Sequence, residues 1–456
     1  MISTRRWGAA LLGLCATFAY AQTDLLGAAR AALAHDPVYA AAVAQSQADA
    51  TKRRQGRAGY LPQISATAGL GYGDINQQTS GARFSGPGFG SNEGIGFDTS
   101  SAGASDANWA LTIRENLYSS AKTATAQQMN AAADAGPVSL QLARQTLLLQ
   151  VAQAYFDVLL AQDNLAALKA EHDTAVRAHA IAQARFEAGD AAITDASDAQ
   201  ARADLAGAQM IEAQTELDLK RAALRDLTGE PDTALQPLTD SAGLAAIQAG
   251  DFADWQKRAL QTSPLIRLSN LGVSAAQAES TRYRADGGTT VDAFASYLGQ
   301  RVNGAGYGGT GGMHSNSAVV GIMVTIPIYS GGMRSAKRDE SLALLNKAEM
   351  DQDAARVRVA RQIRQAYLGL RSAQVRVTAL TQAVHSARLQ LDANQTGFEA
   401  GDRPSIDVLN ARSALSNTQR DLAAARYQVA MERLRLSAAA GELDDREMAQ
   451  INALLH

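Results

Sequence analysis

Two spacings of apolar residues run along the chain and predict different elements. From residue 60 to 72, apolar side chains take every second position, which predicts a β-strand with one apolar face. Small residues fill the positions between them: Ser65, Thr67, Gly69 and Gly71. Between residues 148 and 165 the apolar positions instead recur every three or four residues, as in helices packed side by side. The chain therefore combines strands with long, coiled-coil-like helices.

The same patterns order the first half of the chain as helix, strand, loop, strand, very long helix, tight turn and helix. These elements are predicted at residues 24–57, 60–72, 74–107, 109–114, 121–186 and 193–228. Pro37 is expected to kink or break the first helix. Gly189 is expected to end the long helix, because a tight turn requires a left-handed residue.

An internal repeat accounts for the second half. The motif FEAGD at 186–190 recurs at 398–402, and this offset of 212 residues holds without a gap from 153 to 229. A second offset aligns the earlier segments and matches Pro37 with Pro264. The second copy is predicted to contain a helix, strand, Gly-rich loop, strand, long helix and helix, at residues 251–284, 291–298, 300–316, 318–326, 335–398 and 405–440. The chain is therefore two copies of one structural unit.

Helix lengths predict how each copy is built. At 1.5 Å per residue, a long helix extends for about 95–100 Å, nearly the length of the two shorter helices together. We expect a long helix to lie beside two short helices stacked end to end. The predicted organisation is a signal segment (1–21), a first repeat (22–229), an equatorial linker (230–250), a second repeat (251–441) and a C-terminal periplasmic tail (442–456).

The N-terminus has the features of an export signal. A basic pair, a short apolar stretch and a small-x-small cleavage pattern fill residues 1–21, so the mature chain is expected to begin at Gln22. A lipid anchor at Cys15 is disfavoured, because Leu14 stands where a small residue is expected. Cleavage removes the only cysteine and two arginines, which changes the net charge from −3 to −5. These features suit a bacterial envelope protein.

The amino-acid composition argues against several classes of protein. No basic domain or tail is present, which argues against a nucleic-acid binder. A hydrophobic content of 46% argues against disorder, and a single cysteine excludes a disulfide scaffold, a Cys-rich zinc site and an iron–sulfur protein. Only 5% of the residues are aromatic, which favours closely packed helices over a conventional globular core.

The apolar faces of the strands must be shielded from water, by lipid or by other protein. No apolar run after the signal is long enough for a membrane-spanning helix, so entry into a membrane requires the strands. Strands of about ten residues match a tilted membrane crossing. Four strands cannot close a barrel in lipid, so the chain is expected to pool strands with copies of itself, two copies giving 8 and three giving 12. A soluble sheet with one buried face is the alternative, and the export signal favours the membrane.

Two segments carry a specific combination of motifs, FEAGDAAITD at 186–195 and GFEAGDRPSIDVLNA at 397–411. With the double repeat and the strand pairs, they resemble the TolC family of outer-membrane efflux channels over essentially the whole mature chain. The resemblance implies a mostly α fold with a small transmembrane β part. It implies a homotrimer whose 12-stranded β-barrel lies in outer-membrane lipid and continues into an α-helical periplasmic tunnel. A periplasmic adaptor (membrane fusion) protein and an inner-membrane RND-type pump or ABC transporter would dock at the tunnel tip, for export of drugs or unfolded proteins.

The resemblance also assigns gating roles at the helix tips, where the family holds its tunnel shut with a polar network. Thr194 and Asp195 match network residues of the first repeat. Arg403 matches the gating arginine, which is expected to pair with Thr194 or with an acid across the helix ends. Phe398 falls where the family has a gating tyrosine, so that hydroxyl is missing here.

An acidic constriction is implied beside the gate. Asp407 matches one member of a double aspartate ring, and Asn410 stands in place of the second. Three symmetry-related carboxylates raise one another's pKa and attract cations, but asparagine halves the charge, so cation block should be weaker than in a double ring. Without the resemblance, Asp195 and Asp407 are interpreted as acids that stabilise a helix N-terminus.

The two tight turns are the implied adaptor contacts: Ala188, Gly189 and Asp190 in the first repeat, and Ala400, Gly401 and Asp402 in the second. Glycine is also what any tight helix–helix turn requires, and both interpretations can hold together.

No enzyme, cofactor or metal site is expected. His172 and His179 lie seven residues apart, about 10 Å along a helix, too far to share a metal. The GxGxxG string at 306–311 lacks the following helix of a βαβ unit, so it does not predict a phosphate site. The alternative function is a trimeric coiled-coil envelope scaffold or adhesin. Within the family, the sequence does not distinguish among channels that export drugs, metals or proteins.

Overall fold

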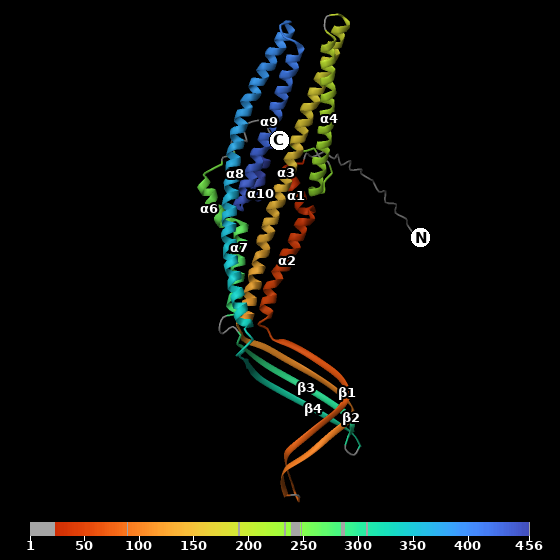
Figure 1. Ribbon diagram of the computed structural model, residues 1–456, viewed down its shortest axis with the longest axis vertical. Coiled ribbons are helices and arrows are strands. Elements are labelled where there is room, and N and C mark those ends of the chain that lie inside the picture. The colour runs from red at the N-terminus through yellow and green to blue at the C-terminus, as the bar shows by residue number, and fades with distance from the viewer. Residues whose placement is uncertain are drawn as a thin grey trace, which may run out of the picture. The chain divides into compact units, whose positions relative to one another are not determined.

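The computed structural model describes residues 23–88, 90–189, 192–231, 234–238, 247, 249–283, 288–306 and 309–455. The predicted signal at 1–21 lies outside these residues, as do 232–233, 239–246 and 248 of the predicted linker. Figure 1 shows the described elements, which in chain order are α1 (Leu25–His35), α2 (Pro37–Ala58), β1 (Gln63–Gly86), β2 (Gly90–Ser119), α3 (Ser120–Glu187), α4 (Ile193–Thr228), α6 (Phe252–Thr262), α7 (Pro264–Arg282), β3 (Thr290–Gly306), β4 (Gly309–Thr325), α8 (Met333–Glu399), α9 (Ser405–Ala440) and α10 (Asp445–Asn452).

The chain forms two compact units, and each unit takes segments from both repeats. Unit 1 consists of Met1–Ser46, Pro137–Leu268 and Asp353–His456. Unit 2 consists of Gln47–Gly136 and Ser269–Gln352, and it contains the whole sheet. The long helices α3 and α8 contribute to both units.

The long helices confirm the internal repeat. Helices α3 and α8 have 68 and 67 residues, and α4 and α9 have 36 each. The bounds of α4 and α9 are those predicted from the sequence. Both helices end at a left-handed glycine, Gly229 with φ +69° and Gly441 with φ +81°, as the aligned glycines of the two copies require.

The first helix of each copy is broken in two. The break at Pro37 confirms the predicted kink or break, but the continuous helix predicted at 251–284 is wrong, because α6 ends before Ser263 and α7 begins at Pro264. Proline forces the preceding residue out of the helical region, and Asp36 and Ser263 have extended ψ values of 120° and 122°. Because Pro264 aligns with Pro37 in the repeat, a break could have been predicted at both prolines.

The four strands form one antiparallel sheet in the order β1-β2-β3-β4. Their lengths of 24, 30, 17 and 17 residues exceed the predicted ten, and the loops predicted at 74–107 and 300–316 are wrong for most of their residues. These segments are rich in glycine and polar residues with only scattered apolar ones, so they lack regular apolar alternation although their backbones pair. Such strands specify their register weakly, and bulges interrupt the ladder between Gly73 and Ile75 and between Thr79 and Phe84.

One face of the sheet is apolar across all four strands, as predicted. Directly opposed residues share a face, and the register sets Ile64 opposite Ile113, Leu111 opposite Tyr297, and Ala295 opposite Val320. Large apolar side chains on this face are exposed in the single chain: Ile64, Leu70, Tyr72, Trp109, Leu111, Ile113, Tyr297, Val320, Ile322 and Val324. Ser65, Thr67, Gly69 and Gly71 lie on the other face.

Among the described helices, none combines the length and the apolar character needed to cross a bilayer.

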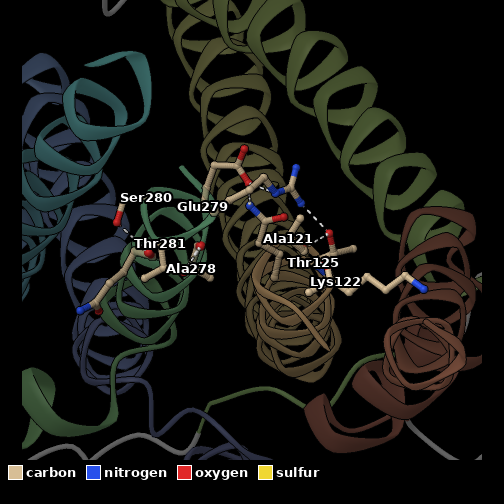
Figure 2. Close-up of polar contacts among 11 residues, drawn as sticks. Ala121, Lys122, Thr125, Ala278, Glu279, Ser280 and Thr281 are labelled. Atoms are coloured by element: carbon tan, nitrogen blue, oxygen red, sulfur yellow. Dashed lines mark hydrogen bonds and ion pairs between the residues drawn. The ribbon is translucent and has the colours of Figure 1, made fainter. Parts of the chain in front are cut away.

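Within unit 2, a polar cluster ties the second repeat to the first (Figure 2). Gln128 of α3 donates to the Glu279 carboxylate of α7 at 2.7 Å. Arg282, one turn further along α7, donates to Thr125 Oγ1 at 2.5 Å and pairs with Glu279 at 3.3 Å. The start of α3 and the end of α7 are therefore fixed to each other.

Within unit 1, Tyr155 anchors the junction between the short helices of the first repeat. Its side chain is fully buried, and its hydroxyl lies 3.1 Å from the Thr23 carbonyl oxygen and 2.9 Å from that of Gln236. Burial raises the pKa of the Tyr155 hydroxyl, which keeps it a hydrogen-bond donor. Leu235 forms a β-bridge with Thr23 and α1 contacts α4, so the chain near residue 235 lies beside the start of α1.

We expect Tyr155→Phe to destabilise the fold by about 1–3 kcal/mol, because the substitution removes a buried hydroxyl that donates to one of two nearby carbonyl oxygens. The repeat supplies a matched control, since Tyr367 is the equivalent residue, is partly exposed and makes one hydrogen bond, to the Gly250 carbonyl at 3.2 Å. Tyr367→Phe should therefore cost clearly less. Chemical unfolding followed by circular dichroism compares the two variants, and equal losses would show that the junction does not depend on Tyr155.

The C-terminal segment, predicted as a periplasmic tail, contains α10 and packs into unit 1. Met448 and Ile451 of α10 are buried in the same apolar cluster as Tyr155. Arg144 of α3 pairs with Asp445 at the start of α10 at 2.8 Å. The segment 442–455 thus covers one side of α3 and α9.

In unit 1 the long helices lie in the order α8, α9, α3, α4 (Figure 1). Tyr427 of α9 donates to the Asp163 carboxylate of α3 at 2.7 Å. His179 Nδ1 of α3 lies 3.2 Å from the Ala196 carbonyl oxygen of α4. Helices α8 and α9 share an apolar cluster formed by Val384, Ala387, Leu391, Ala411, Leu415 and Leu422. Helices α4 and α8 are therefore the outer members of this series.

Candidate functional site

The two helical hairpins of unit 1 end in equivalent tight turns, which Figure 1 shows at the same end of the unit. Gly189 and Gly401 are left-handed, with φ +84° and +82°. The Gly189 N–H donates to the Phe186 carbonyl at 2.9 Å, and the Gly401 N–H donates to that of Phe398 at 3.0 Å. The predicted turns are thus placed as expected, whereas Asp190 lies outside the described residues.

Of the predicted gate residues, the structure brings Arg403 and Asp407 together. Their guanidinium and carboxylate groups are 3.3 Å apart, and 32% of the Asp407 side chain is exposed. The Asn394 amide of α8 donates to the Asp407 carbonyl at 3.3 Å, which ties this turn to the facing helix. Within one chain, Arg403 therefore pairs with the acid of its own turn.

The other predicted gate residues stand apart within one chain. Thr194, Asp195 and Asn410 are exposed, and among the described residues none of them makes a side-chain hydrogen bond or ion pair with Arg403. Asp195 and Asp407 lie in the first turns of α4 and α9, which have no side-chain cap. Both acids are therefore also placed to stabilise a helix N-terminus.

Phe398 has a partner that the sequence analysis missed. The Arg185 guanidinium lies over the Phe398 ring, 5.7 Å from its centroid, so the first hairpin contacts the second at the tip. A cation over an aromatic face is attracted by the quadrupole of the ring. The Phe398 ring thus has a cation partner in the first hairpin.

Comparison of the two copies shows that Arg185 is one of the places where the tips differ, without revealing its partner. In the second copy its position is occupied by Gly397, where an added Cβ would lie 2.8 Å from Arg403 Cγ. In the first copy the position of Arg403 is occupied by Ala191. Each tip therefore carries one arginine at a different place, Arg185 over the ring and Arg403 over the acid.

Within the part of the chain that the structure describes, no group of three or more His, Cys, Asp or Glu residues is close enough to hold a metal ion.

The chain matches the family model of the outer membrane efflux protein at residues 28–230 and 255–442, which is more than half of its length. It is 28% identical to the outer membrane protein TolC of Vibrio cholerae, over 92% of this chain and 91% of that protein. It is also 28% identical to the alkaline protease secretion protein AprF of Pseudomonas aeruginosa, over 94% and 86% of the two chains. The crystal structure of the outer membrane protein VceC of Vibrio cholerae has the same fold, with a TM-score of 0.73, 17% identity, and coverage of 92% of this chain and 97% of that one.

The family model matches two consecutive segments, one for each repeat. Each repeat has a pair of strands, a long helix and a helical hairpin whose turn contains a glycine. The chain belongs to the TolC family of outer membrane efflux proteins.

Proposed function

We propose that this protein is the outer-membrane exit duct of a tripartite efflux or type I secretion system, assembled as a homotrimer and gated at its helix tips. One observation supports this most strongly. The sheet exposes a continuous apolar face across all four strands, which a lone soluble chain would not leave uncovered. Channels of this family are not enzymes, so the transported molecule needs a path and not a catalytic group.

Three copies would pool their sheets into 12 strands, enough for a closed barrel with no free edge in lipid. The exposed Ile, Leu, Val and Tyr residues would face lipid, and the serine, threonine and glycine face would line the lumen. The opposed ladder supports this assignment because it keeps Ile64, Leu111 and Val320 on one side, although it also places Leu298 and Val319 on the small-residue side.

At the tips, three Asp407–Arg403 pairs would surround the axis of the trimer. The carboxylates attract cations only as far as the arginines leave them unpaired. Asn410 adds no charge. We therefore expect a constriction that selects cations weakly and is blocked by multivalent cations less strongly than a double acidic ring.

The turns at Gly189 and Gly401 would receive the periplasmic adaptor, and an inner-membrane RND-type pump or ABC transporter would supply the energy. Both turns are exposed, and an added Cβ at either glycine would meet no atom within 4 Å. The relative AprF is named for protease secretion, which keeps unfolded proteins beside drugs and metals as candidate substrates.

Replacing Gly401 with valine tests the docking role of the turn. The left-handed backbone would be strained by about 1–2 kcal/mol without a clash at Cβ, so trimers should still form while export falls strongly. Gly331→Val is the matched control, because Gly331 has φ +62°, equally open surroundings and no place at the tip. Native electrophoresis reports assembly and dye efflux from cells reports export. Normal export by an assembled Gly401→Val trimer would remove the turn from the docking surface.

A further inference from the structure

An arginine-rich face runs along α8. Between residues 354 and 391 this helix has seven arginines and neither aspartate nor glutamate. All seven are exposed: Arg356, Arg358, Arg361, Arg364, Arg371, Arg376 and Arg388. Arg356 pairs with Asp353 at 3.0 Å, and across the described residues no ion pair joins the other six to an acid. Such a concentration of one charge needs a partner or solvent to offset it.

An apolar stripe follows the same face. Leu368, Val375 and Leu389 are 57%, 70% and 57% exposed and recur at multiples of seven residues. The buried positions of α8, such as Ile363 and Leu370, have the same period and occupy the opposite side of the helix. Arg361 continues the stripe, and Arg364 and Arg371 lie next to it. We call this surface the α8 seam, formed by Arg361, Arg364, Leu368, Arg371, Val375 and Leu389.

Helix α4 carries a similar stripe with the opposite charge. Leu205 and Leu219 are 60% and 61% exposed, lie fourteen residues apart, and share their seven-residue row with Asp198, Glu212 and Asp226. Asp218 borders this row. Leu217 and Leu224, which are buried in the cluster shared with α3, take the other side of α4. We call this surface the α4 seam, formed by Leu205, Glu212, Asp218, Leu219 and Asp226.

Within the described part of the chain, the acids of the α4 seam form no ion pair, although Arg221 and Arg225 lie on the same helix. Gln214 donates to Asp218 at 3.0 Å, but within the described ranges no Lys or Arg forms an ion pair with Glu212, Asp218 or Asp226. Both seams thus lack a charge partner, and they belong to the two outer helices of unit 1 (Figure 1).

The charges of the two seams lie at matching distances from the tips. Arg364 precedes Gly401 by 37 residues, and Asp226 follows Gly189 by 37. Arg371 precedes Gly401 by 30 residues, and Asp218 follows Gly189 by 29. Counted from the last residue of α8 and the first residue of α4, at a rise of about 1.5 Å per residue, Asp226 and Arg364 differ in height by about 3 Å, and Asp218 and Arg371 by about 4.5 Å, when the two helix ends are aligned. Leu219 then falls between Leu368 and Val375.

We propose that the α8 seam docks on the α4 seam of a second copy of this chain, through the pairs Arg364–Asp226 and Arg371–Asp218 around an apolar centre at Leu219. The helices run antiparallel there, because α8 approaches its tip and α4 leaves its own. Each copy presents one seam of each charge, so the contact is head-to-tail and closes when the last copy meets the first. This inference rests on the proposed trimer and names the surfaces that build it.

Charge reversal in full-length protein, purified in detergent, tests the seam. Arg364→Glu with Arg371→Glu sets like charges against each other at every interface, and so does Asp218→Arg with Asp226→Arg. We expect each double variant to lose the trimer by light scattering at concentrations where the unaltered protein is fully trimeric. The quadruple variant should recover it. Arg376→Glu with Arg388→Glu is the control, with the same charge change on the same helix but about a quarter-turn or more away from the stripe.

Disulfide trapping gives a second measurement that does not depend on disrupting assembly. The only cysteine of the chain is Cys15, which lies in the predicted signal, so introduced cysteines have no competitor after cleavage. Asp218→Cys combined with Arg371→Cys should give covalent trimers on oxidation, and either change alone should not.

The outcomes separate the inference from the proposed function. Trimers that resist both reversals and form no disulfide would overturn the seam and leave the trimeric duct standing. Loss of assembly without rescue in the quadruple variant, together with absent disulfides, would also overturn it and would point to another partner for the arginines. An unaltered protein that stays monomeric at all concentrations would instead contradict the proposed function.

Discussion

Replacing Phe398 and Arg403 together with alanine is expected to raise the time-averaged current through the channel about tenfold or more. Phe398→Ala removes the Arg185 contact that joins the two hairpins at the tip. An exposed cation–π contact contributes about 0.5–1 kcal/mol, so three copies contribute roughly 1.5–3 kcal/mol to the closed state. Each 1.4 kcal/mol shifts a two-state equilibrium about tenfold.

Arg403→Ala acts through charge. Without the guanidinium 3.3 Å away, the Asp407 carboxylate is unpaired in each copy, and three like charges then repel one another around the axis. The closed tip should loosen further, and the open channel should prefer cations more strongly. Planar-bilayer recordings of the single and double variants measure both effects.

The two contributions can be separated by matched variants. Arg185→Ala should reproduce Phe398→Ala, because each removes one side of the same contact, and should leave cation preference unchanged. Arg177→Ala removes an exposed arginine of α3 two turns away from Arg185 and should leave the current at its resting value. A current that responds to Arg403→Ala but to neither Arg185→Ala nor Phe398→Ala would remove the ring contact from the gate.

Gly441→Ala is expected to cause the largest loss of stability. Gly441 ends α9 with φ +81°, where an added Cβ would lie 2.8 Å from the Thr262 carbonyl oxygen and 3.0 Å from Ser263 Cα. These are backbone atoms of the break between α6 and α7, which Thr262 also ties to the Ala440 carbonyl at 2.6 Å. A left-handed alanine costs about 1–2 kcal/mol and overpacking about 1–3 kcal/mol, so the total is about 2–5 kcal/mol.

Gly272→Ala is the control for that prediction. Gly272 lies inside α7, and its added Cβ would meet no atom within 4 Å. Alanine there should stabilise the helix by about 0.5–1 kcal/mol, since it restricts the unfolded backbone. Thermal unfolding midpoints should therefore move in opposite directions. A Gly441→Ala variant as stable as the unaltered protein would show that the αL turn does not hold the α6–α7 break in place.

The long helices were predictable because their signals are local. A seam of apolar residues at three and four spacing defines α3, and left-handed glycines such as Gly229 and Gly441 end α4 and α9. Each of these signals occurs twice, once in each repeat. The break at Pro264 was missed although Pro37 had suggested it, because the second copy was treated as one continuous helix.

The polar hairpin extensions and the tip contacts were harder to predict, for different physical reasons. The strands of residues 74–107 pair through backbone hydrogen bonds and a few polar side chains, and neither leaves a hydrophobic period in the sequence. Arg185 and Phe398 are far apart along the chain, and no periodicity marks a contact between two hairpins. Arg403 and Asp407 are four residues apart, about one helical turn, so their ion pair could have been predicted from the sequence.

Single-channel recording of the purified full-length protein in a planar lipid bilayer, with and without Asp407→Ala, tests the central claim most directly. The account predicts a small, cation-selective conductance that a trivalent cation blocks and that Asp407→Ala frees from block. A verified trimer that passes no current, even with Phe398 and Arg403 both replaced by alanine, would contradict the channel and favour an envelope scaffold or adhesin.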